Sequence, residues 1–368
     1  MHLKLLSIVN FKNYEEAGVT LSPEINVFVG NNGHGKTNLL DAIYYLSFCK
    51  SFLNPIDKQN IRIGEKFFLL SGQYFKEEKK IDITVSVQAG QKKKVKKNKK
   101  EYEKLSEHIG LFPAVVISPY DRNLISEGSD TRRKFIDSII SQYDRLYLDT
   151  LIRYNKVLQQ RNALLKQFQE MRIFEAESIE VWNEQLISLG EVIHKKRTDF
   201  LNDFIPIFQK YFDLISNKTE TISITYESQL NESDFATQLE KSHRKDAAVG
   251  YTTVGIHKDD LIFNIHDHPI KKYGSQGQQK SFLIGLRLAQ FELISDLLKM
   301  KPILLLDDIF DKLDHLRVEH LMKLVSDHAF GQVFITDTDQ DRIDKVFQKI
   351  DIERFVFKVE EGKLEKIR

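Results

Sequence analysis

The sequence contains a single cysteine, Cys49, among its 368 residues. One cysteine cannot form an intrachain disulfide, and this usage suits a reducing cytosol. No stretch approaches the roughly twenty consecutive apolar residues that cross a bilayer. The apolar segment after Met1 is also too short for a secretory signal. We therefore expect a cytoplasmic protein that has no membrane partner.

The sequence also lacks an excess of charge of one sign, an internal repeat and a low-complexity linker. Its 54 lysines and arginines nearly balance 53 aspartates and glutamates, which leaves a formal net charge of +1. The overall charge therefore does not indicate whether the protein binds nucleic acid, and only local clusters of basic residues can indicate such a partner. The length allows two or three domains with a buried core.

A glycine-rich stretch near the N-terminus organises the chain. Residues 30–37 read GNNGHGKT and fit the pattern G-x-x-x-x-G-K-[ST]. An apolar run at 25–29 precedes them and helical spacing at 38–46 follows, which is the strand, loop and helix order of a phosphate-binding P-loop. The alternative is a chance glycine turn before a helix. The predicted nucleotide-binding residues are Gly30, Asn31, Asn32, Gly33, His34, Gly35, Lys36, Thr37 and Asn38.

The chemistry of these residues suits a nucleoside triphosphate with Mg²⁺. Glycines let backbone N–H groups turn inward around phosphate oxygens, and the start of the helix adds its positive dipole end. We expect Lys36 to reach the β- and γ-phosphates and Thr37 to place its hydroxyl on Mg²⁺.

An acidic strand end supplies the second half of the predicted site. The apolar run 303–306 is followed by Asp307 and Asp308, and a fully apolar strand belongs to a parallel sheet that is covered on both faces. We expect Asp307 to hold Mg²⁺ and Asp308 to position the attacking water. Lys36 and Asp308 are thus the candidate catalytic residues. A solvated acidic turn is the alternative.

A serine- and glutamine-rich segment precedes this strand. Residues 273–280 read YGSQGQQK and lead into a helical pattern. This segment offers a hydroxyl, free backbone N–H groups and the positive end of a helix, which together can form a second phosphate-binding site, separate from the P-loop. The residues that we expect to contribute are Ser275, Gly277 and Gln278. The alternative is an ordinary helix cap.

Two groups of basic residues are candidate DNA contacts. The stretch 91–100 is dense in lysine, and such a stretch is either a solvated hairpin tip or edge strand, or a contact to phosphate backbone. Arg132 and Arg133 lie at the start of a helical region and offer either an exposed helix face or a second basic surface. The candidate DNA contacts are Lys93, Lys94, Lys96, Lys97, Arg132 and Arg133.

The alternation and spacing of apolar residues divide the chain into regions. Strand patterns cover 3–9, 25–29, 67–74, 81–88, 114–117, 221–226 and 261–265, with a polar connection at 10–22. Helical patterns cover 131–141, 146–169 and 179–211. We predict an α/β head made from residues 1–125 and 251–368, with a compact, mainly helical lobe at 126–250.

These motifs together resemble the ATP-binding-cassette-type heads of the SMC class and, within that class, the RecF family of bacterial recombinational repair proteins. The resemblance covers essentially the whole chain and includes several motifs in the same order. They are 6–14 (LSIVNFKNY), the Walker A motif at 30–37, 117–121 with 128–137, 255–261 (GIHKDDL), the signature motif at 275–280, the Walker B pair Asp307-Asp308 and a D-loop at Leu313-Asp314.

The resemblance implies a P-loop ATPase head with a mixed or parallel sheet, and ATP with Mg²⁺ between two copies of the chain. It also implies an ATP-dependent DNA-binding clamp for gapped or junction DNA in recombinational repair and replication restart. Such a clamp hydrolyses ATP slowly, is stimulated by DNA and aids recombinase loading. Double-stranded and gapped DNA, a homodimer, RecR and RecO are the partners it implies.

Two other functions are open at this point. One is a nucleotide-binding scaffold without productive hydrolysis, against which the Asp307-Asp308 pair argues. The other is a transporter-type ATPase subunit. Thr336-Asp337 stands where such a subunit carries its switch histidine, and no glutamine can be placed as a Q-loop.

Overall fold

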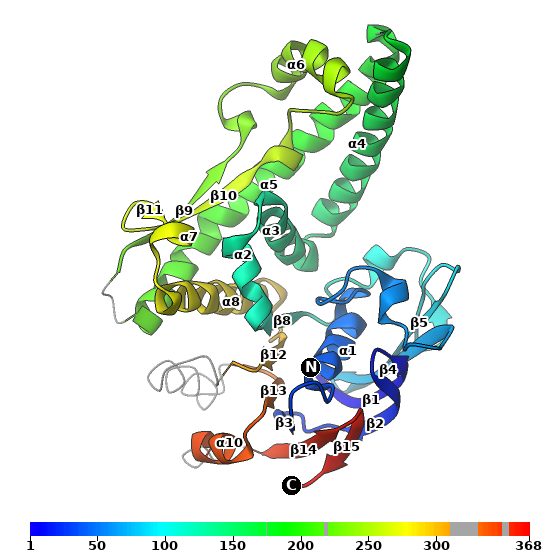
Figure 1. Ribbon diagram of the computed structural model, residues 1–368, viewed down its shortest axis with the longest axis vertical. Coiled ribbons are helices and arrows are strands. Elements are labelled where there is room, and N and C mark those ends of the chain that lie inside the picture. The colour runs from blue at the N-terminus through cyan, green and yellow to red at the C-terminus, as the bar shows by residue number, and fades with distance from the viewer. Residues whose placement is uncertain (174, 217–219, 310–329, 348–352) are drawn as a thin grey trace. The chain divides into compact units, whose positions relative to one another are not determined.

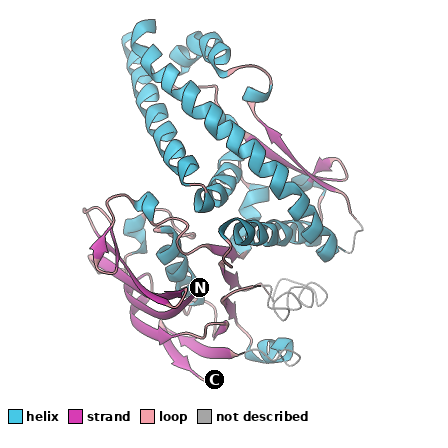
Figure 2. Ribbon diagram, turned by 180° about the vertical axis from the view of Figure 1, so that it is seen from behind, coloured by secondary structure: helices cyan, strands magenta, loops and turns pink. Residues whose placement is uncertain are grey.

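The computed structural model describes residues 1–173, 175–216, 220–309, 330–347 and 353–368. The chain forms two compact units (Figure 1). Unit 1 comprises Met1–Asp121 and Leu286–Arg368, and unit 2 comprises Arg122–Gly285. Unit 1 contains two sheets, whereas helices dominate unit 2 (Figure 2).

The first sheet of unit 1 is antiparallel and has the order β2-β1-β4-β5-β6-β7. Every second side chain faces the core, as Leu6 and Ile8 do on β1 and Phe68 and Leu70 do on β4. The alternation matches the period of two of a strand with one buried face. The strands are β1 (His2–Phe11), β2 (Tyr14–Thr20), β4 (Phe67–Lys76), β5 (Lys79–Gln88), β6 (Lys94–Lys97) and β7 (Lys100–Glu101).

The second sheet of unit 1 has the order β15-β14-β3-β13-β12-β8 and is parallel except at β15. Its central strands are buried at every position, which explains why their sequences are mostly apolar. The strands are β3 (Ile25–Val29), β8 (Ala114–Ile117), β12 (Ile303–Asp307), β13 (Val333–Asp337), β14 (Arg354–Glu360) and β15 (Lys363–Lys366).

Helix α1 (Lys36–Phe48) packs against both sheets and joins their side chains into one core. Phe28 on β3 stacks on Phe357 of β14 with ring centroids 5.2 Å apart. The buried side chain of Gln332 accepts from the Leu3 N–H at 2.7 Å and donates to the carbonyls of Leu3 and Ser22. Gln332 therefore ties the entry of β13 to the first sheet. Helix α10 (Gln340–Phe347) follows β13.

Unit 2 is built on long helices and a small sheet of order β11-β10-β9. On α5, Phe200, Phe204, Phe208 and Phe212 recur every fourth residue and are buried, which is the spacing of one helix face. The elements are α2 (Asn123–Ser126), α3 (Ser129–Tyr143), α4 (Arg145–Met171), α5 (Ala176–Ser216), α6 (Phe235–Val249), α7 (Ile270–Tyr273), β9 (Ile222–Glu227), β10 (Asp260–Ile265) and β11 (His268–Pro269). Helix α8 (Gln276–Leu298) begins in unit 2, and its residues from Leu286 onward belong to unit 1.

A buried arginine connects the elements of unit 2. Arg197 on α5 is 1% exposed and bonds Asp137 on α3 at 3.0 Å, Asp259 at 2.8 Å and the Ile256 carbonyl at 2.8 Å. Removing one partner of such a pair costs about 3–5 kcal/mol, because the other charge is left buried. The segment 255–261, in which we identified a family motif, thus has a structural role in this unit.

Most predicted elements are confirmed. The lysine-rich stretch, predicted as a hairpin tip or an edge strand, contains β6 and β7 at the end of the first sheet. The prediction of a polar connection at 10–22 was wrong, because this segment contains β2. The adjacent exposed residues Glu15 and Glu16 interrupt the alternation of β2 and hide it in the sequence. The predicted domain boundary also differs from the observed one, because residues 251–285 were assigned to the α/β head. These residues belong to unit 2, since β10 pairs with β9 and Phe282 packs on Phe208.

The buried His108 predicts a pH dependence of stability. Its Nε2 lies 2.7 Å from the Leu46 carbonyl, and burial lowers its pKa from 6.5 to about 4. Between these values the unfolded chain binds a proton that the folded chain excludes, so stability falls as the pH drops through this window. In His108→Gln the loss of unfolding free energy between pH 6.5 and 4 should be smaller by roughly 3 kcal/mol, at 1.36 kcal/mol per pKa unit.

Urea unfolding at several pH values measures this difference. His266→Gln is the matched control, because His266 is exposed, and its pH profile should equal that of the wild type. An unchanged profile in His108→Gln would contradict the prediction.

Candidate nucleotide-binding site

The predicted P-loop connects the end of β3 to the start of α1. Three of its glycines have positive φ: Gly30 at 157°, Gly33 at 81° and Gly35 at 110°. Side chains are excluded at two of them. A Cβ would lie 2.3 Å from the Val359 carbonyl oxygen at Gly30 and 2.5 Å from the Asn13 side chain at Gly35. Glycine is therefore required at these two positions, both for the backbone conformation and for the close approach of other segments of the same chain.

Lys36 lies across this loop. Its Nζ donates to the carbonyls of Gly30 at 2.8 Å and Asn31 at 3.1 Å, and the residue is 4% exposed. A buried ammonium held over a glycine loop at a helix start is the arrangement that binds the phosphates of a nucleotide.

Asn13, in the turn between β1 and β2, and Tyr14, the first residue of β2, brace the loop. Asn13 donates to the His34 carbonyl at 3.1 Å and accepts from Asn38 on α1 at 2.7 Å. Tyr14 donates to the Gly35 carbonyl at 3.0 Å. Neither Asn13 nor Tyr14 has a predicted role of its own. Their place in the family segment 6–14 is the only signal for them in the sequence.

The two carboxylates of the predicted site lie at the end of β12. Asp307 Oδ1 accepts from the hydroxyls of Thr37 at 2.9 Å and Thr336 at 2.8 Å. Asp308 has a left-handed backbone with φ 47°, and its Oδ1 is buried without a hydrogen-bond partner among the described residues. A hydroxyl and carboxylates are hard oxygen donors, so these residues fit Mg²⁺.

Burial controls the electrostatics of this edge of the sheet. It raises the pKa of Asp307, and the adjacent charge of Asp308 adds to the effect, while the bonds from Thr336 and Thr37 oppose it. Burial also raises the pKa of Asp337, which is 1% exposed and lies 3.7 Å from Arg342. A cation bound beside these carboxylates would favour their ionised form.

The serine motif forms a capping box at the start of α8. Gln278 N–H donates to Ser275 Oγ at 3.2 Å, and Ser275 N–H donates to Gln278 Oε1 at 2.7 Å. The Gln278 amide also donates to Glu220 at 2.8 Å. Ser275 is exposed and Gly277 partly exposed. The structure thus places these three residues in unit 2 and the Walker residues in unit 1, while the predicted D-loop at Leu313-Asp314 lies outside the described residues.

Three of the six candidate DNA contacts have their charges engaged inside their own unit. Lys93 Nζ bonds Asp57 at 2.8 Å and the Cys49 carbonyl at 2.5 Å. Arg132 forms a two-bond pair with Asp260 at 2.7 and 2.9 Å, and Arg133 donates to the Asp259 carbonyl at 2.6 Å. These contacts argue against a role in binding DNA, because each charge already has an internal partner.

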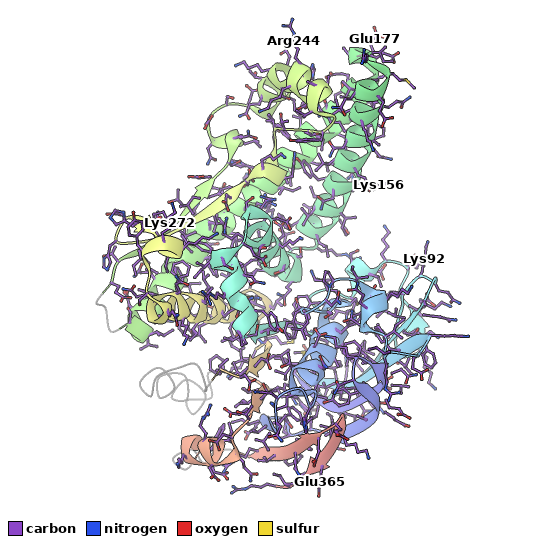
Figure 3. The ribbon with its side chains drawn as sticks, viewed as in Figure 1. Lys92, Lys156, Glu177, Arg244, Lys272 and Glu365 are labelled. Atoms are coloured by element: carbon purple, nitrogen blue, oxygen red, sulfur yellow. The ribbon has the colours of Figure 1, made fainter. Side chains whose placement is uncertain are left out.

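The other three candidates are on β6. Lys94 and Lys96 are exposed and Lys97 is partly exposed, while Val95 between them is buried. Their strand lies near the edge of the first sheet, in the hairpin region where Figure 3 labels Lys92.

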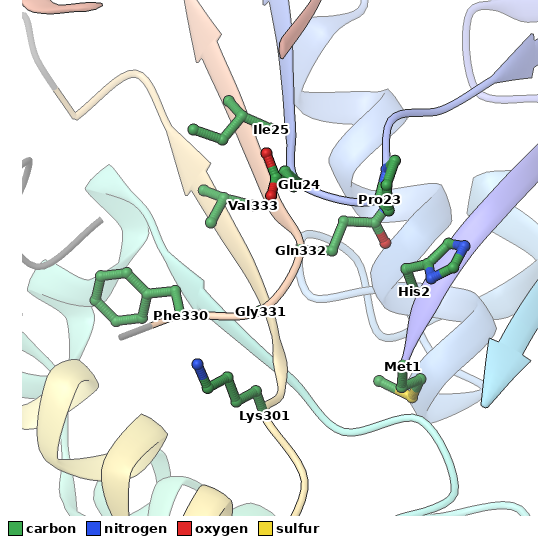
Figure 4. Close-up of a pocket in the computed structure, with 10 residues that line it drawn as sticks. All are labelled: Met1, His2, Pro23, Glu24, Ile25, Lys301, Phe330, Gly331, Gln332 and Val333. Atoms are coloured by element: carbon green, nitrogen blue, oxygen red, sulfur yellow. The ribbon is translucent and has the colours of Figure 1, made fainter. Parts of the chain in front are cut away.

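A separate cavity of about 310 Å³ lies at the opposite end of the parallel sheet, beside Ile25 and Val333, the first residues of β3 and β13 (Figure 4). It is lined by Met1, His2, Pro23, Glu24, Ile25, Lys301, Phe330, Gly331, Gln332 and Val333. None of the predicted nucleotide-binding residues lines it, so we assign it no part in the site.

Comparison with known proteins gives consistent matches. The family model described as the RecF/RecN/SMC N terminal domain matches residues 2–361. The DNA replication and repair protein RecF of Phocaeicola vulgatus is 51% identical over 366 residues, which are 99% of this chain and 98% of that protein. RecF of Flavobacterium johnsoniae is 52% identical over 346 residues, which are 94% of this chain and 96% of that protein.

Solved structures agree with the sequence relatives. A structure of the recombination mediator protein RecF with ATP, in the RecFOR pathway, has a TM-score of 0.90 and 30% identity and covers 100% of this chain and 98% of its own. An Smc head domain of Pyrococcus furiosus has a TM-score of 0.56 at 18% identity and covers 100% of this chain and 96% of its own, so it supports the fold alone.

Substitution of the loop lysine tests the nucleotide site. Lys36→Met removes the ammonium that lies over the loop, and we expect the affinity for a fluorescent ATP analogue to fall by about 100-fold or more, equivalent to roughly 2.7 kcal/mol. Lys4→Met, at an exposed position of unit 1, is the control and should bind like the wild type. Undiminished binding by Lys36→Met would overturn the P-loop assignment.

Proposed function

Because the chain belongs to the RecF family, we propose that it is an ATP-dependent DNA-binding protein of recombinational repair and replication restart. ATP closes a dimer on gapped or junction DNA, slow hydrolysis stimulated by DNA reopens it, and the clamp aids recombinase loading. RecR and RecO are its proposed protein partners. The family membership argues against the transporter-type alternative.

The observation that carries this proposal is the convergence of Lys36, Thr37 and Asp307 at one edge of the parallel sheet. The Lys36 ammonium lies over the glycine loop, and the Thr37 hydroxyl lies 2.9 Å from Asp307 Oδ1. We assign phosphate binding to the loop and Lys36, and Mg²⁺ binding to Thr37 and Asp307. When bound, Mg²⁺ neutralises charge that develops on the phosphates during hydrolysis.

Asp308 is the proposed residue for orienting the attacking water. Its buried Oδ1 has no hydrogen-bond partner among the described residues, so it can accept a proton or a hydrogen bond from a water molecule. This feature favours an ATPase over a scaffold that only binds nucleotide.

ATP serves as the proposed connection between two copies of the chain. The exposed Ser275 and the N–H groups at the start of α8 would contact the nucleotide that is held by the Walker residues of the other copy. A ligand that contacts both subunits stabilises the dimer by the free energy of the contacts that exist only in the dimer. Loss of the γ-phosphate contacts on hydrolysis would then release the partner.

The mass in solution tests the shared site. In Asp308→Asn, which should retain unhydrolysed ATP, light scattering should show a monomer that doubles in mass only with Mg-ATP. Adding Ser275→Arg should abolish the doubling, because a bulky side chain replaces the small hydroxyl at the interface. Ser233→Arg, at another exposed serine of unit 2, should leave it intact. A monomer under all conditions would exclude the clamp mechanism.

The DNA surface that we propose lies on the β6 hairpin. Lys94 and Lys96 alternate with the buried Val95, so both side chains leave the same face of the strand. Exposed lysines bind phosphate backbone without reading base sequence, and they displace counterions when they do so.

The salt dependence of DNA binding tests this surface. For a duplex with a single-stranded gap, removing two phosphate contacts in Lys94→Ala/Lys96→Ala should reduce the slope of log affinity against log salt by about 1.8, at about 0.9 per contact. The control Lys156→Ala/Lys195→Ala, at two exposed lysines of unit 2, should keep the wild-type slope. An unchanged slope in the β6 variant would place the DNA elsewhere.

A further inference from the structure

Thr336 occupies a central place in the parallel sheet. Its strand, β13, lies between the P-loop strand β3 and the carboxylate strand β12. Thr336 is directly opposite Asp307 on one side and Phe28 on the other. In the sequence, Thr336-Asp337 is notable only because it stands where a transporter-type ATPase has its switch histidine.

The hydroxyl of Thr336 contacts both residues of the Walker B pair. It donates to Asp307 Oδ1 at 2.8 Å and accepts from the Asp308 N–H at 3.0 Å, and the residue is 0% exposed. A hydroxyl has one proton to donate and lone pairs to accept. The Thr336 hydroxyl therefore acts as a hydrogen-bond donor to Asp307 and as an acceptor from Asp308 at the same time.

The bond to Asp308 bears on a strained backbone. Asp308 has φ 47°, in the left-handed region that residues other than glycine adopt at a cost. The bond from its N–H to Thr336 helps to hold this conformation, from which the side chain of Asp308 projects. Thr336 thus fixes one oxygen of Asp307 and the backbone from which Asp308 extends.

We propose that Thr336 is a positioning residue for ATP hydrolysis, acting through Asp307 and Asp308 and not by contact with the nucleotide. This inference rests on the proposed ATPase function and adds a residue to it. Partners of catalytic and metal-binding carboxylates commonly affect activity by about 10–100-fold. The competing explanation is a buried threonine that only supports the fold.

Thr336→Val tests the proposal, because it removes the hydroxyl and keeps the shape of the side chain. The kcat for ATP should fall by about 10–100-fold, while KM and the binding of a fluorescent ATP analogue stay within about threefold. Thr336→Ser keeps the hydroxyl and should restore kcat to within about threefold of the wild type. A merely structural role would not separate kcat from KM in this way.

Thr150→Val is the matched control. Thr150 is also buried, and its hydroxyl bonds the Leu146 carbonyl within α4 of unit 2. This variant should keep the wild-type kcat. Wild-type kcat in Thr336→Val, or an equal loss in Thr336→Ser and Thr336→Val, would overturn the role of Thr336 and leave the ATPase function standing.

Hydrogen exchange gives a readout that needs no turnover. In the nucleotide-free protein, the Asp308 amide should exchange at least about fivefold faster in Thr336→Val than in Thr336→Ser, since it loses a hydrogen bond of ordinary strength. Equal exchange would overturn the proposal even if the wild type hydrolysed no ATP. An inactive wild type would contradict the proposed function separately.

Discussion

Parallel hydrogen bonding between β13 and its two neighbours, β3 and β12, determines where the proposed nucleotide site can form. Parallel strands that pair in register end at the same edge of a sheet, so the loop after β3 and the carboxylates at the end of β12 come together. The segments are far apart in the chain, at 25–29, 303–307 and 333–337. The site therefore depends on pairing between segments from the two ends of the chain. The Gln332 side chain also joins the entry of β13 to Leu3 of the first sheet.

The glycine loop depends on a second constraint, the close approach of two turns. The turn between β1 and β2 contributes Asn13, which bonds His34 and Asn38. The turn between β14 and β15 contributes the Gly362 N–H, which donates to the same His34 carbonyl at 3.1 Å. One turn comes from each sheet of unit 1, and both contact the P-loop. The loop conformation is thus determined by its surroundings as well as by its own glycines, and a Cβ at Gly35 has no room because Asn13 occupies that space.

The local sequence was sufficient to predict features that depend on neighbouring residues, such as strands and tight turns. The apolar run at 303–306 predicted a buried parallel strand, the run at 25–29 predicted the strand before the loop, and the glycine pattern predicted the turn into α1. It was insufficient where a side chain acts across the fold. Thr336 is an ordinary strand residue until β12 is placed beside it, and β2 is hidden by the exposed pair Glu15 and Glu16. The boundary between unit 2 and the C-terminal part of unit 1 also depends on nonlocal pairing, since β10 pairs with β9 and is therefore part of unit 2.

The basic residues show why a cluster of charge in a sequence does not identify a surface. Several arginines of this chain form partly or fully buried ion pairs: Arg132 with Asp260, Arg161 with Asp246 and Arg197 with Asp137 and Asp259. The pairs Arg132–Asp260 and Arg197–Asp137 are forked, with two hydrogen bonds each. The guanidinium group suits this use, because its planar donors match a carboxylate, whereas the ammonium of lysine is a strongly hydrated point charge. The charges exposed on β6 are lysines. A partner held by such point charges is bound through its backbone, so the proposed DNA contact at Lys94 and Lys96 should depend on the density of phosphate and not on base sequence.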